Sequence, residues 1–362
     1  MSEIILPIVE ILIGIILLFT GGEFFIQGAV ALSLILGIPQ IVIGLTVVAL
    51  GTSSPELLVS LNSVFKGSDE LAVSNVIGSN IFNILVVLGI SSLIKPLKVK
   101  SRIVRRDVPL LIAISCAVWA MSSTGLLTWQ AGIFLLLCLI LNTLWEINTI
   151  KEKDEDIKTA EPEINDSLLN KNLINIFCKL IFGILLLAFG SNILVNGSIF
   201  LATYMGINET VIGLTIVATG TSLPELVTSI VAALKGRTDL AIGNVIGSNL
   251  LNQLLILGSC TLVSGLKGLT INSSLIKIDL PIMVLTTFAC MPIFWTQGKI
   301  SRIEGFILIN IYTFYICDKL LFLNKFELIQ EFRLFLIIYF TILSLILFVK
   351  NKFKILYFNS NT

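Results

Sequence analysis

Long apolar segments recur along this chain and are separated by short polar ones. Most of them are near twenty residues long, the length an α-helix needs to cross a hydrocarbon core about 30 Å thick. The pattern predicts helical spans at residues 4–32, 38–65, 70–94, 104–122, 127–147, 173–201, 207–234, 239–264, 278–296, 303–322 and 334–350. We therefore expect an all-α polytopic membrane protein with two groups of five spans, ten core transmembrane helices, and an eleventh C-terminal helix.

Composition agrees with this pattern and excludes several functions. Of the 362 residues, 56% are hydrophobic and 13% are charged, against about 25% charged in soluble domains. The net charge of +1 gives no basic excess that would indicate a nucleic-acid partner. Histidine is absent, which removes imidazole from any catalytic or metal-binding scheme. The six cysteines form no CxxC pair, so neither a disulfide framework nor a zinc site is indicated.

One strongly polar stretch, Lys151–Asn172, divides the two groups of spans. It is too short and too charged to form a packed core, so we interpret it as a solvated linker. The expected organisation is a first repeat at 1–147, a charged linker at 148–172, a second repeat at 173–322, and the extra helix and tail at 323–362.

Lysine and arginine in the short loops predict the orientation. The segment after the third span carries six of them, Lys95, Lys98, Lys100, Arg102, Arg105 and Arg106, whereas the loops expected on the opposite side carry few. We therefore expect a multi-pass protein of the cell (inner) membrane, with the N-terminus outside and the central linker in the cytoplasm.

The two halves contain an internal repeat. Val42–Leu57 reads VIGLTVVALGTSSPEL and Val211–Leu226 reads VIGLTIVATGTSLPEL, identical at thirteen of sixteen positions with an offset of 169. The same offset aligns the NVIGSN segments that begin at Asn75 and Asn244. Five spans is an odd number, so the second repeat must enter the membrane inverted. Inverted repeats place substrate sites near the midplane, where broken helices meet.

Each repeat interrupts a span with the sequence GTSxPE. Pro55 and Pro224 have no main-chain N–H, so each leaves the carbonyl one turn earlier without its helical hydrogen bond. Such a carbonyl is tolerated only where it is buried in protein or lines a wet cavity. A proline kink alone would be the simpler interpretation. However, Glu56 and Glu225 follow the prolines directly, and a carboxylate inside the membrane costs at least about 2.5 kcal/mol.

Two glutamates brought together in the membrane indicate a bound cation. Hard cations such as Ca²⁺ take six to eight oxygen ligands, and the motifs offer only oxygen, which disfavours soft transition metals. The candidate ligands are Glu56, Glu225, Thr52, Thr221, Ser53 and Ser222.

A second motif, GSNxxN, follows in each repeat. Ser79 and Asn83 are four residues apart and share one helix face, as do Ser248 and Asn252. We expect these four residues to line the site. For Asn80 and Asn249, hydrogen bonding between helices is an equally good explanation. Polar residues of the first and sixth spans, such as Glu23 and Gln27, are expected to be helix-contact residues on spans that could slide as gates.

The paired GTSxPE and GSNxxN segments resemble the two alpha repeats of the sodium/calcium exchanger family, in the calcium/cation antiporter superfamily, and the chain looks like a prokaryotic-type member. The resemblance implies ten spans, an ion-binding core formed by spans 2, 3, 7 and 8, and electrogenic exchange of about three Na⁺ for one Ca²⁺. It also implies roles for individual residues. Ca²⁺ would be bound by Glu56 and Glu225, with Thr52 and Thr221 beside them. Flanking Na⁺ sites would be formed by the carbonyls of Ala49 and Ala218 and by Ser53, Ser222, Ser79 and Ser248. The middle of the site would be lined by Asn83 and Asn252.

Two features depart from the family pattern. Some members, including the potassium-dependent branch, carry aspartate where this chain has Asn83 or Asn252, so the resemblance argues against potassium transport. The eleventh span, 334–350, exceeds the usual ten.

The sequence thus predicts a secondary active antiporter, not an enzyme, with Ca²⁺ and Na⁺ as substrates, the lipid bilayer as surroundings and no cofactor. The principal alternative is a proton-coupled calcium antiporter, because a buried carboxylate can exchange H⁺ for a cation. A channel and a membrane-embedded enzyme are further alternatives, the latter lacking any recognisable catalytic constellation.

Overall fold

A computed structural model describes residues 2–157, 173–205, 218–295 and 298–323. The chain divides into two compact units, residues 1–309 and residues 310–362. The predicted eleventh span, the C-terminal tail, linker residues 158–172 and the first part of the seventh span lie outside the described residues.

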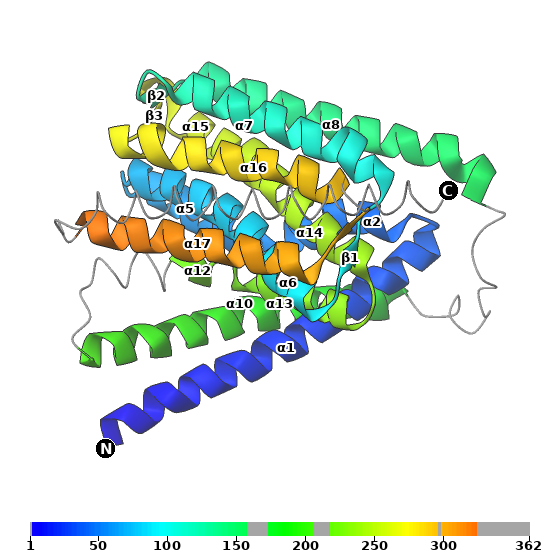
Figure 1. The fold of residues 1–362 in the computed structure, drawn as a ribbon, viewed down its shortest axis with the longest axis horizontal. Helices are drawn as coiled ribbons and strands as arrows, with labels where there is room; N and C mark the ends of the chain where they lie inside the picture. Colours follow the sequence, from blue (N-terminus) through cyan, green and yellow to red (C-terminus); the bar gives the residue numbers. More distant parts are fainter. Residues whose placement is uncertain (1, 158–172, 206–217, 296–297, 324–362) are drawn as a thin grey trace, which may run out of the picture. The chain divides into compact units, whose positions relative to one another are not determined.

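The first half is a series of helices with two very short strands (Figure 1). Its elements are α1 (Ser2–Leu36), α2 (Gln40–Ile43), η1 (Gly44–Val48), α3 (Ala49–Thr52), α4 (Ser54–Phe65), α5 (Asp69–Phe82), η2 (Asn83–Val87), α6 (Leu88–Ile94), β1 (Leu97–Lys98), η3 (Ile103–Asp107), α7 (Val108–Ser122), β2 (Leu126–Leu127) and α8 (Trp129–Ile157). Helix α8 continues ten residues beyond the predicted end of its span, into the predicted linker.

The second half repeats this order. Its elements are α10 (Leu173–Tyr204), α12 (Ala218–Gly220), α13 (Leu223–Leu234), α14 (Thr238–Leu251), η5 (Asn252–Leu257), α15 (Gly258–Val263), η6 (Gly265–Lys267), β3 (Leu269–Thr270), η7 (Leu275–Asp279), α16 (Leu280–Trp295), β4 (Lys299–Ile300) and α17 (Arg302–Leu323). Segments η1, η2, η3, η5 and η7 are π-helical turns.

Helical segments lie within each of the first ten predicted spans. Among the described residues, six helices are long and apolar enough to cross a membrane. Gln40–Thr52 and Ser54–Phe65, which meet at a bend of 45°, add a seventh span if they are counted together. The total of ten plus one spans stays a prediction.

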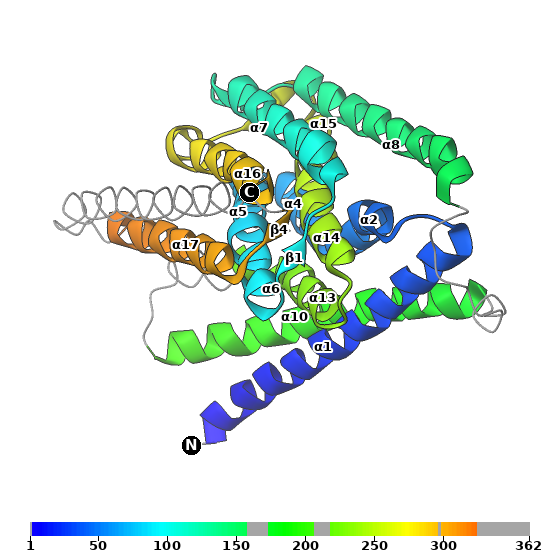
Figure 2. The same cartoon turned by 45° about the vertical axis from the view of Figure 1, so that its right-hand side comes forward.

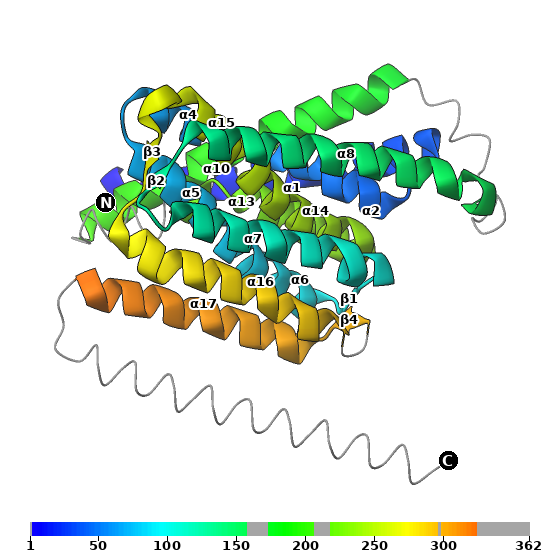
Figure 3. The ribbon, with the colours of Figure 1, turned by 90° about the horizontal axis from the view of Figure 1, so that it is seen from above.

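Two small antiparallel sheets join the halves. Strand β1 pairs with β4, and β2 pairs with β3. Because α7 separates β1 from β2 and α16 separates β3 from β4, the two sheets lie at opposite ends of these helices, which run side by side (Figures 1 and 3). The loops that hold β1 and β4 therefore lie at the same end of α7 and α16, as the predicted alternation of spans requires.

Burial separates a core from a periphery. In their most apolar stretches, 78% of α5–α6 and 89% of α14–α15 is buried, against 28% for α1 and for α10. Apolar side chains such as Leu6 and Phe189 stay exposed on α1 and α10, which suits contact with lipid. The core is thus formed mainly by the helices that carry the repeated motifs.

Glycines set the closest helix contacts. A side chain at Gly247 would meet the main-chain oxygen of Leu45 at 2.5 Å, so α14 packs directly on the backbone of η1. Helices α1 and α10 cross in the same manner (Figure 2): a Cβ atom at Gly183 would lie 2.7 Å from the nitrogen of Phe25, and one at Gly190 would lie 3.0 Å from the oxygen of Gly14. These contacts use small residues as membrane helices commonly do.

Candidate ion-binding site

The first GTSxPE motif breaks its helix at Ser53. This residue has φ −83° and ψ 5°, outside the helical region, between α3 and α4. Pro55 falls in the first turn of α4, where a missing N–H is not needed. Glu56 occupies the same turn, near the positive end of the helix dipole.

The second motif forms the same break. Ser222 has φ −93° and ψ 7°, and Pro224 and Glu225 open α13. The main-chain carbonyl of Gly220, four residues before Pro224, accepts a hydrogen bond of 2.5 Å from Ser191 Oγ of α10. The sequence predicted that proline would free this carbonyl, and a neighbouring helix satisfies it.

The structure brings the two glutamates together through serines of the opposite repeat. Ser53 Oγ donates to Glu225 Oε1 at 2.8 Å, and Ser222 Oγ donates to Glu56 Oε1 at 3.1 Å. Both glutamates are 0% exposed, and their carboxyl groups are close enough to interact electrostatically. Each half therefore positions the carboxylate of the other half.

The serines of the second motif differ between the halves. Ser222 Oγ, which donates its one hydrogen to Glu56, also lies 2.9 Å from Ser79 Oγ and accepts a hydrogen bond from it. The equivalent Ser248 Oγ is buried and has no hydrogen-bond partner among the described atoms. The two halves thus have similar folds but different hydrogen bonding at the site.

Two asparagines that the sequence did not single out connect the broken helices. Asn75 Oδ1 accepts from Thr221 Oγ1 at 3.2 Å, and Asn75 Nδ2 donates to Ser60 Oγ at 3.0 Å and to the Glu56 carbonyl at 3.5 Å.

Asn244 makes the equivalent contacts in the other half. It accepts from Thr52 Oγ1 at 3.1 Å and donates to Ser229 Oγ at 3.0 Å and to the Glu225 carbonyl at 3.3 Å. Asn75 and Asn244 are each the first residue of an NVIGSN segment, and this repetition was the signal in the sequence that could have identified them. The predicted ligands Thr52 and Thr221 are therefore held by asparagines of the opposite repeat.

The predicted asparagines Asn83 and Asn252 each begin a π-helical turn, η2 and η5. Such turns are frequent at functional sites. Both residues are 0% exposed. Neither amide atom of Asn83 has a hydrogen-bond partner in the described structure, whereas Asn252 Nδ2 donates to Asn80 Oδ1 at 3.4 Å.

Asn80 and Asn249 connect helices. Asn249 Nδ2 donates to the main-chain oxygen of Asn80 at 3.2 Å, which links α14 to α5. Hydrogen bonding between helices, one of the two explanations that the sequence left open, is observed for this pair.

The two alanines carry predicted main-chain ligands. The carbonyl of Ala49 accepts from the Ser53 nitrogen at 2.9 Å and lies 3.3 Å from Thr52 Oγ1, whose one hydrogen it shares with Asn244 Oδ1. Ala218 begins α12, directly after the residues that the structure leaves undescribed.

Several buried oxygens at the site have no hydrogen-bond partner in the described structure. They are Glu56 Oε2, Glu225 Oε2, Ser248 Oγ, Asn83 Oδ1 and Asn252 Oδ1. A buried oxygen without a partner costs about 1–3 kcal/mol, more when it is charged. This set, which combines carboxylate, hydroxyl and amide oxygens, has the chemistry that hard cations bind.

Comparison with known proteins identifies the family. The family model described as sodium/calcium exchanger protein matches residues 6–148 and 175–321. The chain belongs to the sodium/calcium exchanger family. It is 36% identical over 315 residues to the putative antiporter CaxA of Alkalimonas amylolytica, a match that covers 83% of this chain and 94% of the relative. It is 31% identical over 339 residues to the sodium/calcium exchanger MaX1 of Methanosarcina acetivorans, covering 83% and 95%.

A solved structure shows the same architecture. The sodium-calcium exchanger NCX_Mj, in crystals soaked with Na⁺ and Sr²⁺, superimposes with a TM-score of 0.73 at 29% identity and covers 87% of this chain and 98% of its own. This exchanger family member is therefore a polytopic all-α membrane protein with an inverted repeat, and a cation antiporter rather than an enzyme. The sequence-based prediction of fold class and family is confirmed.

Proposed function

We propose that this family member exchanges Na⁺ for Ca²⁺, with Glu56 and Glu225 as the central Ca²⁺ ligands. The observation that carries the proposal is the crossed pairing of the two buried carboxylates with the serines of the opposite repeats. One oxygen of each carboxylate is bound by a serine, and the second has no partner among the described atoms. A cation between the two glutamates would bind these second oxygens.

The remaining predicted residues take supporting roles in this proposal. Thr52 and Thr221 complete the Ca²⁺ site beside the glutamates. Na⁺ is coordinated on either side by the carbonyls of Ala49 and Ala218 and by Ser53, Ser222, Ser79 and Ser248. Asn83 and Asn252 line the middle. The oxygens without partners on Ser248, Asn83 and Asn252 support these assignments.

The charges favour electrogenic exchange. Two ionised glutamates are neutralised by one Ca²⁺, whereas about three Na⁺ leave one surplus positive charge. The site offers two fixed carboxylates, because Asn83 and Asn252 stand where other members carry aspartate, and we therefore propose no K⁺ transport. Ca²⁺ and Na⁺ are the transported substrates, and no resident cofactor is assigned.

Alternating access is proposed to involve α1 and α10. These two helices pack on each other through glycines and expose most of their surface, whereas the core helices are largely buried. A movement of the α1–α10 pair over a fixed core could open the site to each side in turn, which would be a shift between populated states.

The proposed location is the cell (inner) membrane, with the N-terminus outside and the linker in the cytoplasm. The distribution of Lys and Arg among the loops supports this orientation. The pairing of β1 with β4 agrees with loop residues 95–103 and 298–301 sharing one side.

The test is uptake of radioactive Ca²⁺ into proteoliposomes loaded with Na⁺ and diluted into Na⁺-free medium. We expect uptake that requires internal Na⁺ and increases when a K⁺ diffusion potential makes the interior negative. Glu225→Gln, which keeps the size of the side chain and removes its charge, should abolish uptake while expression stays intact.

Other outcomes would contradict parts of the proposal. Uptake that ignores Na⁺ but follows an imposed pH gradient would indicate a proton-coupled antiporter, in which the buried glutamates exchange H⁺ for Ca²⁺. Full transport by Glu225→Gln would refute the central role of the carboxylates.

A further inference from the structure

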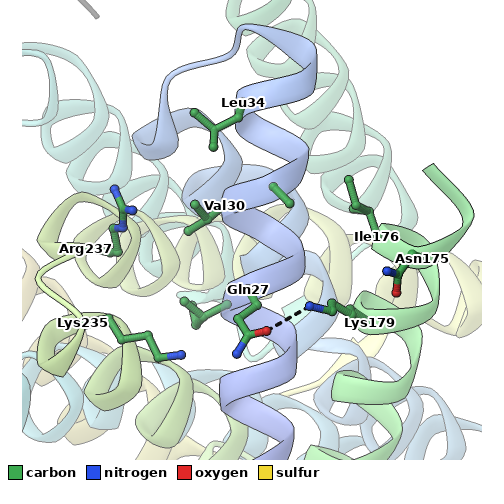
Figure 4. Close-up of a pocket in the computed structure, with 10 residues that line it drawn as sticks. Gln27, Val30, Leu34, Asn175, Ile176, Lys179, Lys235 and Arg237 are labelled. Carbon is green, nitrogen blue, oxygen red and sulfur yellow. Dashed lines mark hydrogen bonds between the residues drawn. The ribbon is translucent and has the colours of Figure 1, made fainter. Parts of the chain in front are cut away.

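A cavity lined by both apolar and basic residues lies along α1, away from the site of the two glutamates. It has a volume of about 370 Å³. Its lining residues come from α1, from the start of α10, and from the loop between α13 and α14 (Figure 4). We propose that this cavity binds one anionic phospholipid of the surrounding membrane.

The basic side chains stand on two sides of α1. Lys179 lies on the α10 side, and Lys235 and Arg237 lie on the opposite side, so that α1 forms the floor between them (Figure 4). The lining residues include these three cations and no acidic side chain. The arrangement would place cationic groups around a phosphate from two directions.

Existing contacts leave most of this charge uncompensated. Lys235 Nζ forms an ion pair with Glu23 at 2.7 Å, and the Lys235 side chain stays 34% exposed. Lys179 Nζ donates to the neutral Gln27 at 3.0 Å. Arg237 forms no ion pair within the described parts of the chain. A cavity with a net charge of about +2 attracts an anion.

The apolar part of the lining indicates a lipid rather than a free anion. Ile26, Val30, Ala31 and Leu34 of α1, with Ile176 of α10, provide apolar surface next to the cations. An acyl chain can lie along this surface while the head group meets Lys179 and Arg237. The same loop also approaches Lys95, whose Nζ lies 3.1 Å from where a Cβ of Gly236 would be.

The position along the chain fits the surface of a bilayer. Lys235 and Arg237 form the short loop between two core helices and belong to the side that carries most loop Lys and Arg. Basic clusters at that side of a membrane recognise anionic head groups, at about 1 kcal/mol for each Lys or Arg.

Native mass spectrometry of the purified full chain can measure the binding. The chain is titrated with dioleoylphosphatidylglycerol or with dioleoylphosphatidylcholine, and the equilibrium constant for the first bound lipid is compared. We expect tighter binding of phosphatidylglycerol. Lys179→Gln and Arg237→Gln should each weaken it about fivefold, the equivalent of about 1 kcal/mol, and together about 25-fold.

A matched double variant controls for the loss of two charges. Lys98→Gln with Lys299→Gln removes two exposed lysines that pair across β1 and β4 on the same side of the protein. This control should bind phosphatidylglycerol as the unmodified chain does. Glycerophosphoglycerol, the head group without acyl chains, should not compete at equal concentration.

Three results would overturn the proposal. The control could weaken binding as much as the cavity double variant, which would indicate only general attraction between charges. Glycerophosphoglycerol could compete as well as the lipid, so that the apolar lining plays no part. Finally, phosphatidylglycerol could bind only after the acidic residues of the linker, such as Asp154 and Glu155, are replaced by neutral ones, which would identify the linker as the occupant.

Discussion

Removal of the Asn75 side chain tests how the two repeats position their glutamates. Asn75 lies on α5, yet it contacts Ser60 in the helix that carries Glu56, and Thr221 in the opposite repeat. Asn75→Ala removes the hydrogen bonds to Ser60, of 3.0 Å, and to Thr221, of 3.2 Å. It also removes the 3.5 Å contact with the Glu56 carbonyl, a distance at the limit for a hydrogen bond.

The magnitude follows from these distances. Each of the two well-formed bonds contributes about 0.5–1.5 kcal/mol, so the substitution should destabilise the protein by roughly 1–3 kcal/mol. If about 1.4 kcal/mol of this loss is taken from the free energy of Ca²⁺ binding, the affinity for Ca²⁺ falls tenfold. We expect both effects, because the same side chain supports the helix break and holds Thr221.

The assay is thermal unfolding of the detergent-solubilised protein over a Ca²⁺ titration, since a ligand that binds the folded state raises its apparent stability. The matched control is Ser74→Ala, one residue earlier on α5, whose hydroxyl donates to the carbonyl of Glu70 in its own helix. The control should shift the unfolding temperature by no more than about one degree. It should leave the Ca²⁺ affinity unchanged.

A double-mutant cycle isolates the contact between repeats. Asn75→Ala and Thr221→Val share one hydrogen bond, so their effects on stability should be non-additive by about 0.5–1.5 kcal/mol. Additive effects would show that the contact is energetically neutral. If Asn75→Ala behaved like Ser74→Ala in both unfolding and Ca²⁺ affinity, the reasoning would be refuted.

Three further substitutions test other parts of the site and fold. Asn83→Asp should change the ion profile of transport, with folding unaffected, and an unchanged profile in uptake assays would remove Asn83 from the site. Ser248→Ala loses no hydrogen bond of the described structure, so it should leave the unfolding temperature unchanged and raise the Na⁺ concentration for half-maximal uptake; an unchanged Na⁺ dependence would exclude it as a ligand. Gly21→Ala would bring a Cβ within 3.0 Å of the Gly183 oxygen and should slow exchange and destabilise the α1–α10 pair by about 1–3 kcal/mol. The neighbouring Gly22→Ala is its control, and equal behaviour of the two would contradict the close-packing argument.

The sequence predicts the family and the central pair of glutamates because both depend on local signals. Apolar segment length identifies spans, and thirteen identities in sixteen positions identify the repeat. An odd number of spans then inverts the second half, which is enough to expect Glu56 and Glu225 together. The structure supplies their crossed partners, Ser53 and Ser222.

Contacts that depend on register across elements could not be predicted in this way. Asn75 and Asn244 look like helix-packing residues until α5 and α14 are placed against the broken helices. The pairing of β1 with β4 joins residues about two hundred positions apart, and no pattern within a two-residue strand specifies its partner. The π-helical turns at Asn83 and Asn252 likewise leave no signal in hydropathy.

The asymmetry between the repeats has a physical consequence for an exchanger. If both halves had identical hydrogen bonding, the site would be equally prepared to open to either side. Instead, Ser79 of the first repeat is hydrogen-bonded to Ser222, whereas its equivalent in the second repeat, Ser248, has no bond among the described atoms. In the alternating-access mechanism that we propose, the two states exchange the local geometry of the two halves. The difference between Ser79 and Ser248, the serines of the second motif, is therefore the kind of difference that the proposed movement of α1 and α10 would reverse.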